Sequence, residues 1–356
     1  MLPYFLLFVG ALVLYPTSHL SFAARARGQV LQIPVFPAFL LVLFIGLRFE
    51  VGGDWAAYIG YLNRAYEFNF VDLFLLEDPA YQLINWIAAS FAAEVWLVNL
   101  ISAAIFTYGL IRFANSLPDP KLAIVVAIPY LVMVVAMGYQ RQGIALGLLM
   151  AGLPHLFQRR IVKYTAFVVL AATFHKSAIV MLPFAVLAST RNRWLMYPAL
   201  LAIGYFSYQA LVADALDSLV VGYIDAVYQS QGALIRVLMC VLPSIIFLIL
   251  FKRYQLFGFQ KSFWLIMSIV SVCTLGALFF SSSSTAIDRL ALYLIPIQLF
   301  VFSGLPEIFS AKRHVKKHGF VRLLIVLYSL VVMVVWLVFA GHRGYWVPYN
   351  FYPLFD

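Results

Sequence analysis

The stretch MLPYFLLFVGALVLY, residues 1–15, carries no charged side chain. It lacks the basic segment and the small-residue cleavage site of a signal peptide, so we predict a first membrane-spanning helix over residues 2–18. The remainder of the 356-residue chain has the same character, with 64% hydrophobic and 11% charged residues. Its mean hydropathy is +0.96. No soluble core buries that much apolar surface, so the composition predicts a polytopic membrane protein.

Apolar runs long enough to cross about 30 Å of hydrocarbon recur along the whole chain, some of them shorter and broken. We predict an all-α helical bundle of about 12 spanning helices, forming a single transmembrane domain over residues 1–356. The predicted spans are 2–18, 30–47, 94–112, 121–138, 141–157, 161–174, 177–189, 194–211, 233–251, 262–280, 289–306 and 320–340.

Lysine and arginine accumulate in cytoplasmic loops, which sets the orientation of the predicted spans. All the basic clusters face the cytoplasm together only if PAYQLINWIAASF, residues 79–91, does not cross, and if 161–189 is a hairpin of two short helices. We therefore predict a short re-entrant or interfacial helix at 79–91, with extracytoplasmic loops at 48–93 and 212–232. Seven basic residues then lie on the outer face: Arg48, Arg64, Arg141, Lys176, Arg236, Arg289 and Arg343.

Arg141 lies in AMGYQRQGIALG, residues 136–147, at the turn between two predicted spans. Its guanidinium either snorkels to lipid headgroups or binds phosphate oxygens with its planar fork, and we favour phosphate. The neighbouring Tyr139, Gln140 and Gln142 are candidates for contacts with sugar rings and hydroxyls.

Two further outer arginines lie in or beside apolar spans. Arg289 precedes Tyr293 by about one helical turn, so both lie on one face, while Asp288 is either a local counter-ion or part of a site. Arg236 lies about one turn inside its span, where an unpaired charge is costly and often marks a ligand site.

His175 heads the turn in ATFHKSAIVMLP, residues 172–183, and is followed by Lys176. Short helices that meet inside a membrane bundle are typical positions for ligand sites. A neutral imidazole near pH 7 is suited to accept a hydroxyl proton, so His175 is a candidate base. Lys176 is a substrate-binding candidate or a snorkelling anchor.

The stretch LRFEVGGDWAAYIGYLNRAYEF, residues 47–68, is the most polar outer segment before the 79–91 helix. Arg48, Glu50 and Asp54 frame a Gly-Gly step that lets backbone approach a bulky ligand, and Tyr58 follows on a predicted interfacial helix. The tyrosines also fit an aromatic belt. Asp54 is the second candidate base.

Several function classes lack support in the sequence. It contains no nucleotide-binding glycine motif, no G-x-S-x-G and no H-E-x-x-H, and the two cysteines fall in apolar segments, so we predict no cofactor and no metal. The basic residues occur in loop-like bursts, which argues against nucleic-acid binding.

Five motifs in order, LRFEVGGDWAAYIGYL, EDPAYQLINWI, YQRQGIALGLLM, ATFHKSAIVMLP and DRLALYLIP, together resemble the EpsG-like branch of Wzy-type bacterial polysaccharide polymerases. The resemblance runs over residues 47–296. One departure is Glu77-Asp78-Pro79-Ala80, where the family tends to have Glu-Pro-Gly.

The resemblance implies transfer of a growing glycan from undecaprenyl pyrophosphate to the sugar hydroxyl of another lipid-linked repeat unit. The reaction would occur on the outer face of the bacterial cytoplasmic membrane, with a chain-length regulator as a further partner. Arg141 and Arg289 would stabilise the pyrophosphate with support from Arg48 and Arg236, and Asp54 or His175 would be the base. An O-antigen ligase and a non-enzymatic flippase of lipid-linked oligosaccharides are the alternatives.

Overall fold

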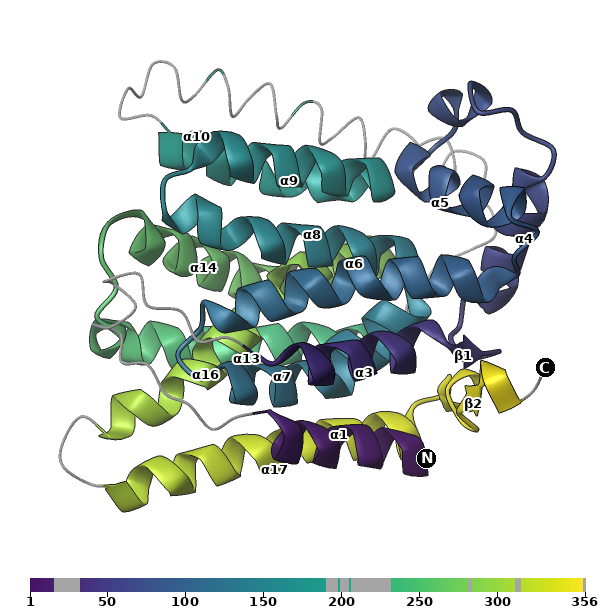
Figure 1. Ribbon diagram of the computed structural model, residues 1–356. Helices are drawn as coiled ribbons and strands as arrows, with labels where there is room; N and C mark the ends of the chain where they lie inside the picture. The colour runs from purple at the N-terminus through teal and green to yellow at the C-terminus, as the bar shows by residue number, and fades with distance from the viewer. Residues whose placement is uncertain are drawn as a thin grey trace.

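The computed structural model describes residues 1–15, 33–189, 232–280, 284–310 and 315–354, and the single residues 198 and 205. The described part is a bundle of helices that run roughly along one direction (Figure 1). Its α-helices are α1 (Leu2–Leu14), α3 (Val35–Gly46), α4 (Trp55–Ala65), α5 (Pro79–Ser90), α6 (Val95–Asn115), α7 (Pro120–Ala127), α8 (Gln140–Phe157), α9 (Ile161–Phe174), α10 (Pro183–Ser189), α13 (Ala233–Leu250), α14 (Gly258–Phe280), α15 (Ser284–Ala291), α16 (Pro296–Ser310) and α17 (Val315–Phe339).

Shorter turns complete or link these helices. The π-helical segment η2 (Ile128–Ala136) continues α7, and the 3-10 segments η3 (Lys176–Met181) and η6 (Leu292–Leu294) precede α10 and α16. Further 3-10 turns lie at Asp72–Leu75, Phe251–Tyr254, Arg343–Tyr345 and Tyr352–Leu354. The strands β1 (Arg48–Phe49) and β2 (Asn350–Phe351) form one antiparallel pair.

The predicted all-α membrane class is confirmed. Helices occupy the predicted spans that the structure describes, whereas most of the predicted span at 194–211 and loop at 212–232 lies outside the described residues, as do Arg25, Arg27, Arg191 and Arg193. The count of about 12 spans stays a prediction. Five helices among the described residues are long and apolar enough to cross a membrane: Val95–Asn115, Ala233–Tyr254, Gly258–Phe280, Ile287–Phe309 and His318–Phe339.

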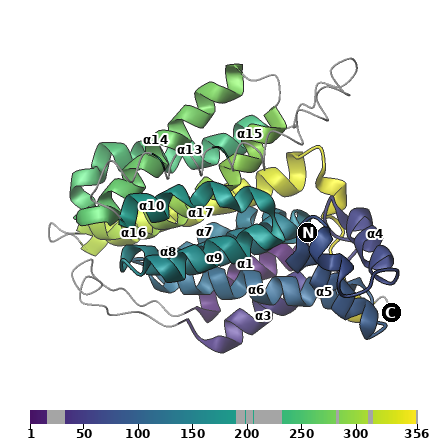
Figure 2. The same cartoon turned by 90° about the horizontal axis from the view of Figure 1, so that it is seen from above.

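Helix α8 forms the centre of the bundle, where it packs against α6 and α9 (Figure 2). Most of its residues are buried. Glycines allow the close approach to α6, because a Cβ on Gly147 would lie 2.7 Å from the Cα of Phe106 and one on Gly109 would overlap the Gly147 backbone. This contact fixes the start of α8, and with it Arg141, relative to α6.

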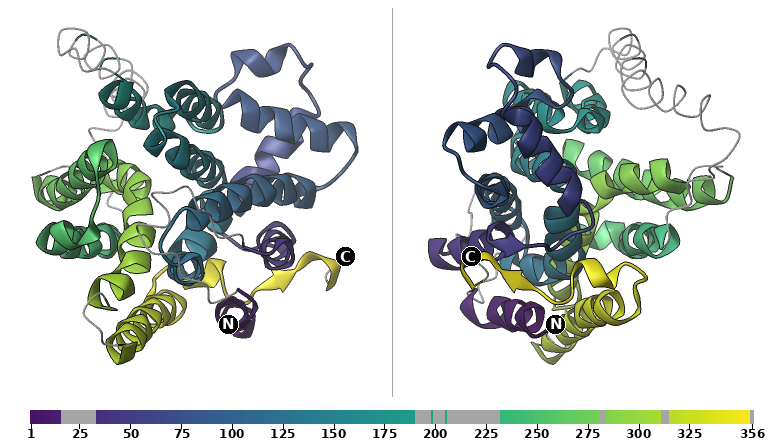
Figure 3. Two further views of the ribbon diagram at one scale, coloured as in Figure 1. Left: turned by 60° about the vertical axis from the view of Figure 1, so that its left-hand side comes forward. Right: turned by 90° about the vertical axis from the view of Figure 1, so that its right-hand side faces the viewer.

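Predicted outer and inner charges lie at opposite ends of the bundle. At one end, α4, α5, the β1–β2 pair and the N-terminus gather around the start of α8 (Figures 1 and 3). Arg141 and Lys176, both predicted to be outside, share contacts there with Asp78. At the other end Asp119, before α7, pairs with Arg322 of α17 at 3.1 Å. Helix α5 packs against α4, α6 and α9 at the first end, so a helix is present at 79–91, and its failure to cross stays a prediction.

The turn after α3 is held by the C-terminal segment. β1 pairs with β2, and the Gly52 amide donates to the Tyr345 carbonyl at 2.7 Å. Gly52 has a φ of 115°, and a Cβ there would overlap the Met137 carbonyl, so only glycine fits. The Trp346 ring nitrogen donates to the Met133 carbonyl at 2.6 Å, which ties the same segment to η2.

Candidate active site at one end of the bundle

Asp78 is the centre of a buried polar cluster that joins α5, α8 and the turn after α9. Its Oδ2 lies 2.7 Å from Arg141 Nη1 and 3.6 Å from His175 Nδ1, and its Oδ1 accepts from the Lys176 amide at 3.2 Å. The Asp78 side chain is 4% exposed, whereas that of Arg141 is 27% exposed. We call Asp78, Arg141, His175 and Lys176 the Asp78 cluster. In this cluster the buried Asp78 carboxylate holds the partly exposed guanidinium of Arg141.

The position of Arg141 is locally unfavourable for its helix. It lies in the first turn of α8, where the positive end of the helix dipole repels a cation. Asp78 compensates, and the Arg141 guanidinium also lies 4.8 Å from the centroid of the Tyr61 ring. A cation maintained against the helix dipole is expected where an anion binds, because functional sites keep features that local stability disfavours.

His175 ends α9 in an extended conformation, with φ −159° and ψ 112°. Within the described residues, its buried Nδ1 has no hydrogen-bond partner, because 3.6 Å to Asp78 exceeds hydrogen-bond distance. A small movement of the ring toward Asp78 would form that bond and leave Nε2 to accept a proton. The geometry therefore keeps His175 as a candidate base.

Asp54 lies at the start of α4, which packs against α5. It is exposed, and its Oδ2 is 3.5 Å from the Tyr58 hydroxyl. Burial by its neighbours raises the pKa of Asp54 above its ordinary value, while the charges of Arg289 and Arg141 and the bond from Tyr58 lower it.

The Tyr58 hydroxyl also links this carboxylate to the start of α8. It accepts a hydrogen bond from the backbone N–H of Gln140 at 2.6 Å. The Tyr58 hydroxyl therefore caps the N-terminus of α8, the helix that carries Arg141. Tyr58 is buried and lies 3.4 Å from the Gly138 carbonyl. Tyr58 therefore positions Asp54 and α8 relative to each other.

Arg289 is joined to the start of α8 through its backbone. Its carbonyl accepts from Gln142 Nε2 at 2.7 Å, while its side chain is exposed. On the next turn, the Tyr293 hydroxyl lies 2.7 Å from Ser177 Oγ, which connects η6 to η3 behind His175. Gln142 and Tyr293 are both buried, so they align the polar elements of the site from within.

Arg236 and Asp288 form a bidentate ion pair beside this region. Arg236 Nε and Nη2 each lie 2.7 Å from an oxygen of Asp288. Their side chains are 6% and 10% exposed. Asp288 is therefore the counter-ion of Arg236, a partner that the sequence alone did not identify.

Two predicted substrate-binding residues lie inside the protein. Arg48 is 0% exposed and donates to the Ile45 and Val51 carbonyls and to Asn99 Oδ1 at 2.6, 3.1 and 3.2 Å. Burial lowers its pKa to about 10, and nearby tyrosines oppose that shift. Gln140 is 1% exposed and uses both ends of its amide within the protein. We therefore replace the predicted substrate contact of both residues with a structural role.

Three further predicted binding residues, Tyr139, Lys176 and Glu50, are at least partly exposed. Tyr139, half-buried, precedes α8. Lys176 Nζ lies 3.4 Å from the exposed Glu77 carboxylate. Glu50 is exposed, with a φ of 54°, in the turn before Gly52. Among the described residues, no group of three or more His, Cys, Asp and Glu side chains forms a metal-ligand set.

The sequence that carries these elements matches the profile of a known family. The EpsG family profile matches residues 32–351, which contain every residue of the site. The chain belongs to the EpsG family. No curated protein and no solved structure matches it. Membership of the EpsG family indicates a membrane polysaccharide polymerase that acts on a lipid-linked glycan.

The sequence did not identify Asp78 as the centre of this EpsG-family site. Its signal was an aspartate directly before Pro79, the first residue of α5, where an acidic residue and a proline are both typical of a helix start. Asp78 has a left-handed backbone, φ 53° and ψ 57°, and its side chain accepts no capping hydrogen bond from the amides of α5. Its carboxylate faces Arg141 instead. An aspartate that leaves its own helix uncapped serves the site rather than the helix.

Proposed function

We propose that this protein is a polysaccharide polymerase that transfers a growing glycan from undecaprenyl pyrophosphate to the sugar hydroxyl of another lipid-linked repeat unit. The observation that carries the proposal is the Asp78 cluster, in which Arg141 Nη1 lies 2.7 Å and His175 Nδ1 lies 3.6 Å from the same Asp78 oxygen. Cations fixed in a partly dry site favour a leaving pyrophosphate, whose charge grows during the transfer. Family membership supports the reaction class.

In the proposed step, the acceptor hydroxyl oxygen attacks the anomeric carbon of the donor glycan. The bond from that carbon to the pyrophosphate oxygen breaks, and its electron pair leaves with the lipid pyrophosphate. The hydroxyl proton passes to Asp54 or His175, the two candidate bases. Arg141 and Arg289 neutralise the departing pyrophosphate, and no nucleotide is consumed.

We further propose that the end of the bundle that contains α4, α5 and the Asp78 cluster faces outward from the bacterial cytoplasmic membrane. The separation of Asp78–Arg141 from Asp119–Arg322 supports this side assignment together with the positive-inside rule. A reporter tag in the loop 114–120 tests it. The tag should give a cytoplasmic signal, and an extracytoplasmic signal would reverse the assignment. The regulator of chain length expected from the family resemblance would meet the protein on the same outer side.

Gel analysis of surface polysaccharide from cells that lack the gene tests the function. A polymerase defect leaves single repeat units, a ligase defect leaves long unattached chains, and a flippase defect leaves neither. Arg141→Ala and Arg289→Ala should reproduce the deletion, whereas the exposed Arg64→Ala, on α4, should restore long chains. Full-length chains from both active-site variants would refute the pyrophosphate assignment.

Neutral substitution of the two candidate bases separates an enzyme from a flippase. Asp54→Asn keeps the shape of the side chain, and His175→Gln keeps a polar side chain of similar size. Each substitution removes a group that can accept a proton. A polymerase loses chain growth in at least one variant, whereas a flippase needs no base and would retain transport in both. Normal chains from both variants would therefore exclude the proposed mechanism.

A further inference from the structure

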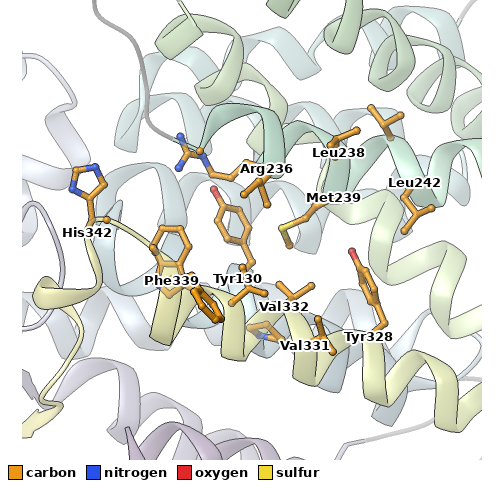
Figure 4. Close-up of a pocket in the computed structure, with 18 of the residues that line it drawn as sticks. Tyr130, Arg236, Leu238, Met239, Leu242, Tyr328, Val331, Val332, Phe339 and His342 are labelled. Atoms are coloured by element: carbon orange, nitrogen blue, oxygen red, sulfur yellow. The ribbon is translucent and has the colours of Figure 1, made fainter.

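An apolar groove of about 680 Å³ lies between α13 and α17, with Pro129 and Tyr130 of η2 at its floor. This volume falls within the roughly 300–1,000 Å³ typical of ligand pockets. Met239 of α13 and Val332 of α17 face each other across it (Figure 4). None of its apolar lining residues takes part in the proposed transfer step.

The groove opens on the outside of the bundle. Its rim residues Ile235, Val331 and Phe339 are 56%, 59% and 76% exposed. They lie on two helices that are long and apolar enough to cross a membrane, so the opening faces hydrocarbon. A ligand that enters there comes from the bilayer and is itself apolar.

The two ends of the groove differ in polarity. Arg236 and His342 lie toward one end, and Leu242 and Tyr328 lie toward the other (Figure 4). Arg236 is held there by Asp288. The polar end is therefore suited to the boundary between a lipid chain and its charged headgroup.

The polar end is connected to the candidate active site. Asp288 precedes Arg289, whose carbonyl accepts from Gln142, the neighbour of Arg141. Burial raises the pKa of Tyr139, and the charges of Arg236, Asp288, Asp54 and Arg289 all act on its hydroxyl. Tyr139 thus lies within electrostatic reach of both the groove end and the site.

We propose that the groove holds the first isoprene units of the polyprenyl carrier of the glycan donor, with its pyrophosphate directed past the Arg236–Asp288 pair to Arg289 and Arg141. This inference rests on the proposed function. The carrier fits because it combines a chain that approaches within the bilayer with a phosphate that must reach the arginines. A bulk phospholipid is not a substrate, so its binding at the catalytic end would serve no step of the proposed reaction.

Photolabelling of the purified full-length protein in nanodiscs tests the groove directly. The probes are a polyprenyl phosphate with a diazirine near its phosphate and a phosphatidylglycerol with the same diazirine. The polyprenyl probe should label α13 and α17 between residues 235–245 and 328–339, and unlabelled polyprenyl phosphate should compete. Equal labelling by the phosphatidylglycerol probe, or labelling elsewhere, would overturn the proposal.

Tryptophan substitutions fill the groove from either wall. Met239→Trp and Val332→Trp should each reduce polyprenyl labelling about tenfold, a change of about 1.4 kcal/mol in binding free energy. Ile249→Trp and Leu327→Trp are matched controls, because these residues lie on the same helices, are 75% and 45% exposed and do not line the groove. Thermal melting identifies any variant that fails to fold. If one of the two groove variants does not fold, the labelling of the other one tests the proposal. Unchanged labelling in folded groove variants would refute the inference.

The lipid test and the function test fail separately. Labelling uses a carrier without glycan and does not require transfer. Normal chain growth in both Arg141→Ala and Arg289→Ala together with competed labelling would reject the proposed pyrophosphate assignment and leave the lipid site intact. Loss of chain growth in Arg141→Ala together with uncompeted labelling would reject only the groove.

Discussion

Replacement of Asp78 by asparagine removes one charge and keeps the shape of the side chain. Asparagine retains an oxygen for the Lys176 amide, but its NH2 group faces the guanidinium of Arg141, where Oδ2 now lies 2.7 Å away. Exposed ion pairs contribute about 0–1 kcal/mol, whereas breaking a fully buried pair costs about 3–5 kcal/mol. With side chains 4% and 27% exposed, this pair lies between those limits.

We therefore expect Asp78→Asn to cost about 1.5–3 kcal/mol, the range for a hydrogen bond to a charged group. If the whole cost falls on the placement of Arg141 in the transition state, transfer slows by about 10- to 100-fold, at about 1.4 kcal/mol per factor of ten. Chain length on polysaccharide gels and thermal melting of the purified protein measure the two effects.

The neighbouring carboxylate provides the control for this experiment. Glu77 is 71% exposed and lies 3.4 Å from Lys176 Nζ, so Glu77→Gln removes the same charge from a solvated pair and should leave chain length and melting near wild type. Equal effects of the two substitutions, or wild-type behaviour of Asp78→Asn, would refute the assignment of Asp78 as the residue that positions Arg141.

Three other perturbations have defined outcomes. If Asp54 is the base, activity falls as acidification protonates it, and Tyr58→Phe shifts this acidic limb to higher pH because it removes a hydrogen bond that lowers the Asp54 pKa; an unshifted limb would contradict Asp54 as the base. Arg48→Lys should lower the melting temperature, since a lysine cannot replace three guanidinium bonds in a fully buried position, and unchanged melting would contradict its structural role. Gly52→Ala should destabilise the protein by about 1–3 kcal/mol in melting experiments, whereas Gly53→Ala, whose Cβ would meet only ordinary contacts, should not.

Hydropathy and loop charge predicted the fold well because they act over many residues. Each apolar run sums small contributions, so the predicted limits of α9, residues 161–174, agree with the structure. A helix at 79–91 is predicted to be re-entrant or interfacial because of the cost of placing basic residues on the wrong side, and its position in the membrane stays a prediction. Its observed limits, Pro79–Ser90, differ by one residue.

The side-chain contacts could not be predicted in the same way, because burial depends on how distant helices meet. Arg48 and Arg141 are both outer arginines beside a predicted span, and no local pattern distinguishes them. The structure encloses Arg48 with carbonyls and Asn99, and leaves Arg141 partly open. Asp78 reads locally as a helix start, and only the packing of α5 against α9 shows its partners.

The ways in which two arginines bind their carboxylates separate a structural pair from a functional one. Asp288 uses both oxygens on two nitrogens of Arg236, and that pair is almost fully buried. Arg236 therefore has little capacity to take up a phosphate, because a ligand would have to displace a complete bidentate contact. In the described part of the chain, Asp78 accepts from one nitrogen of Arg141, and 27% of that side chain is exposed. Asp78 thus orients Arg141 and leaves part of its guanidinium accessible, which favours Arg141 over Arg236 as the pyrophosphate ligand of the proposed reaction.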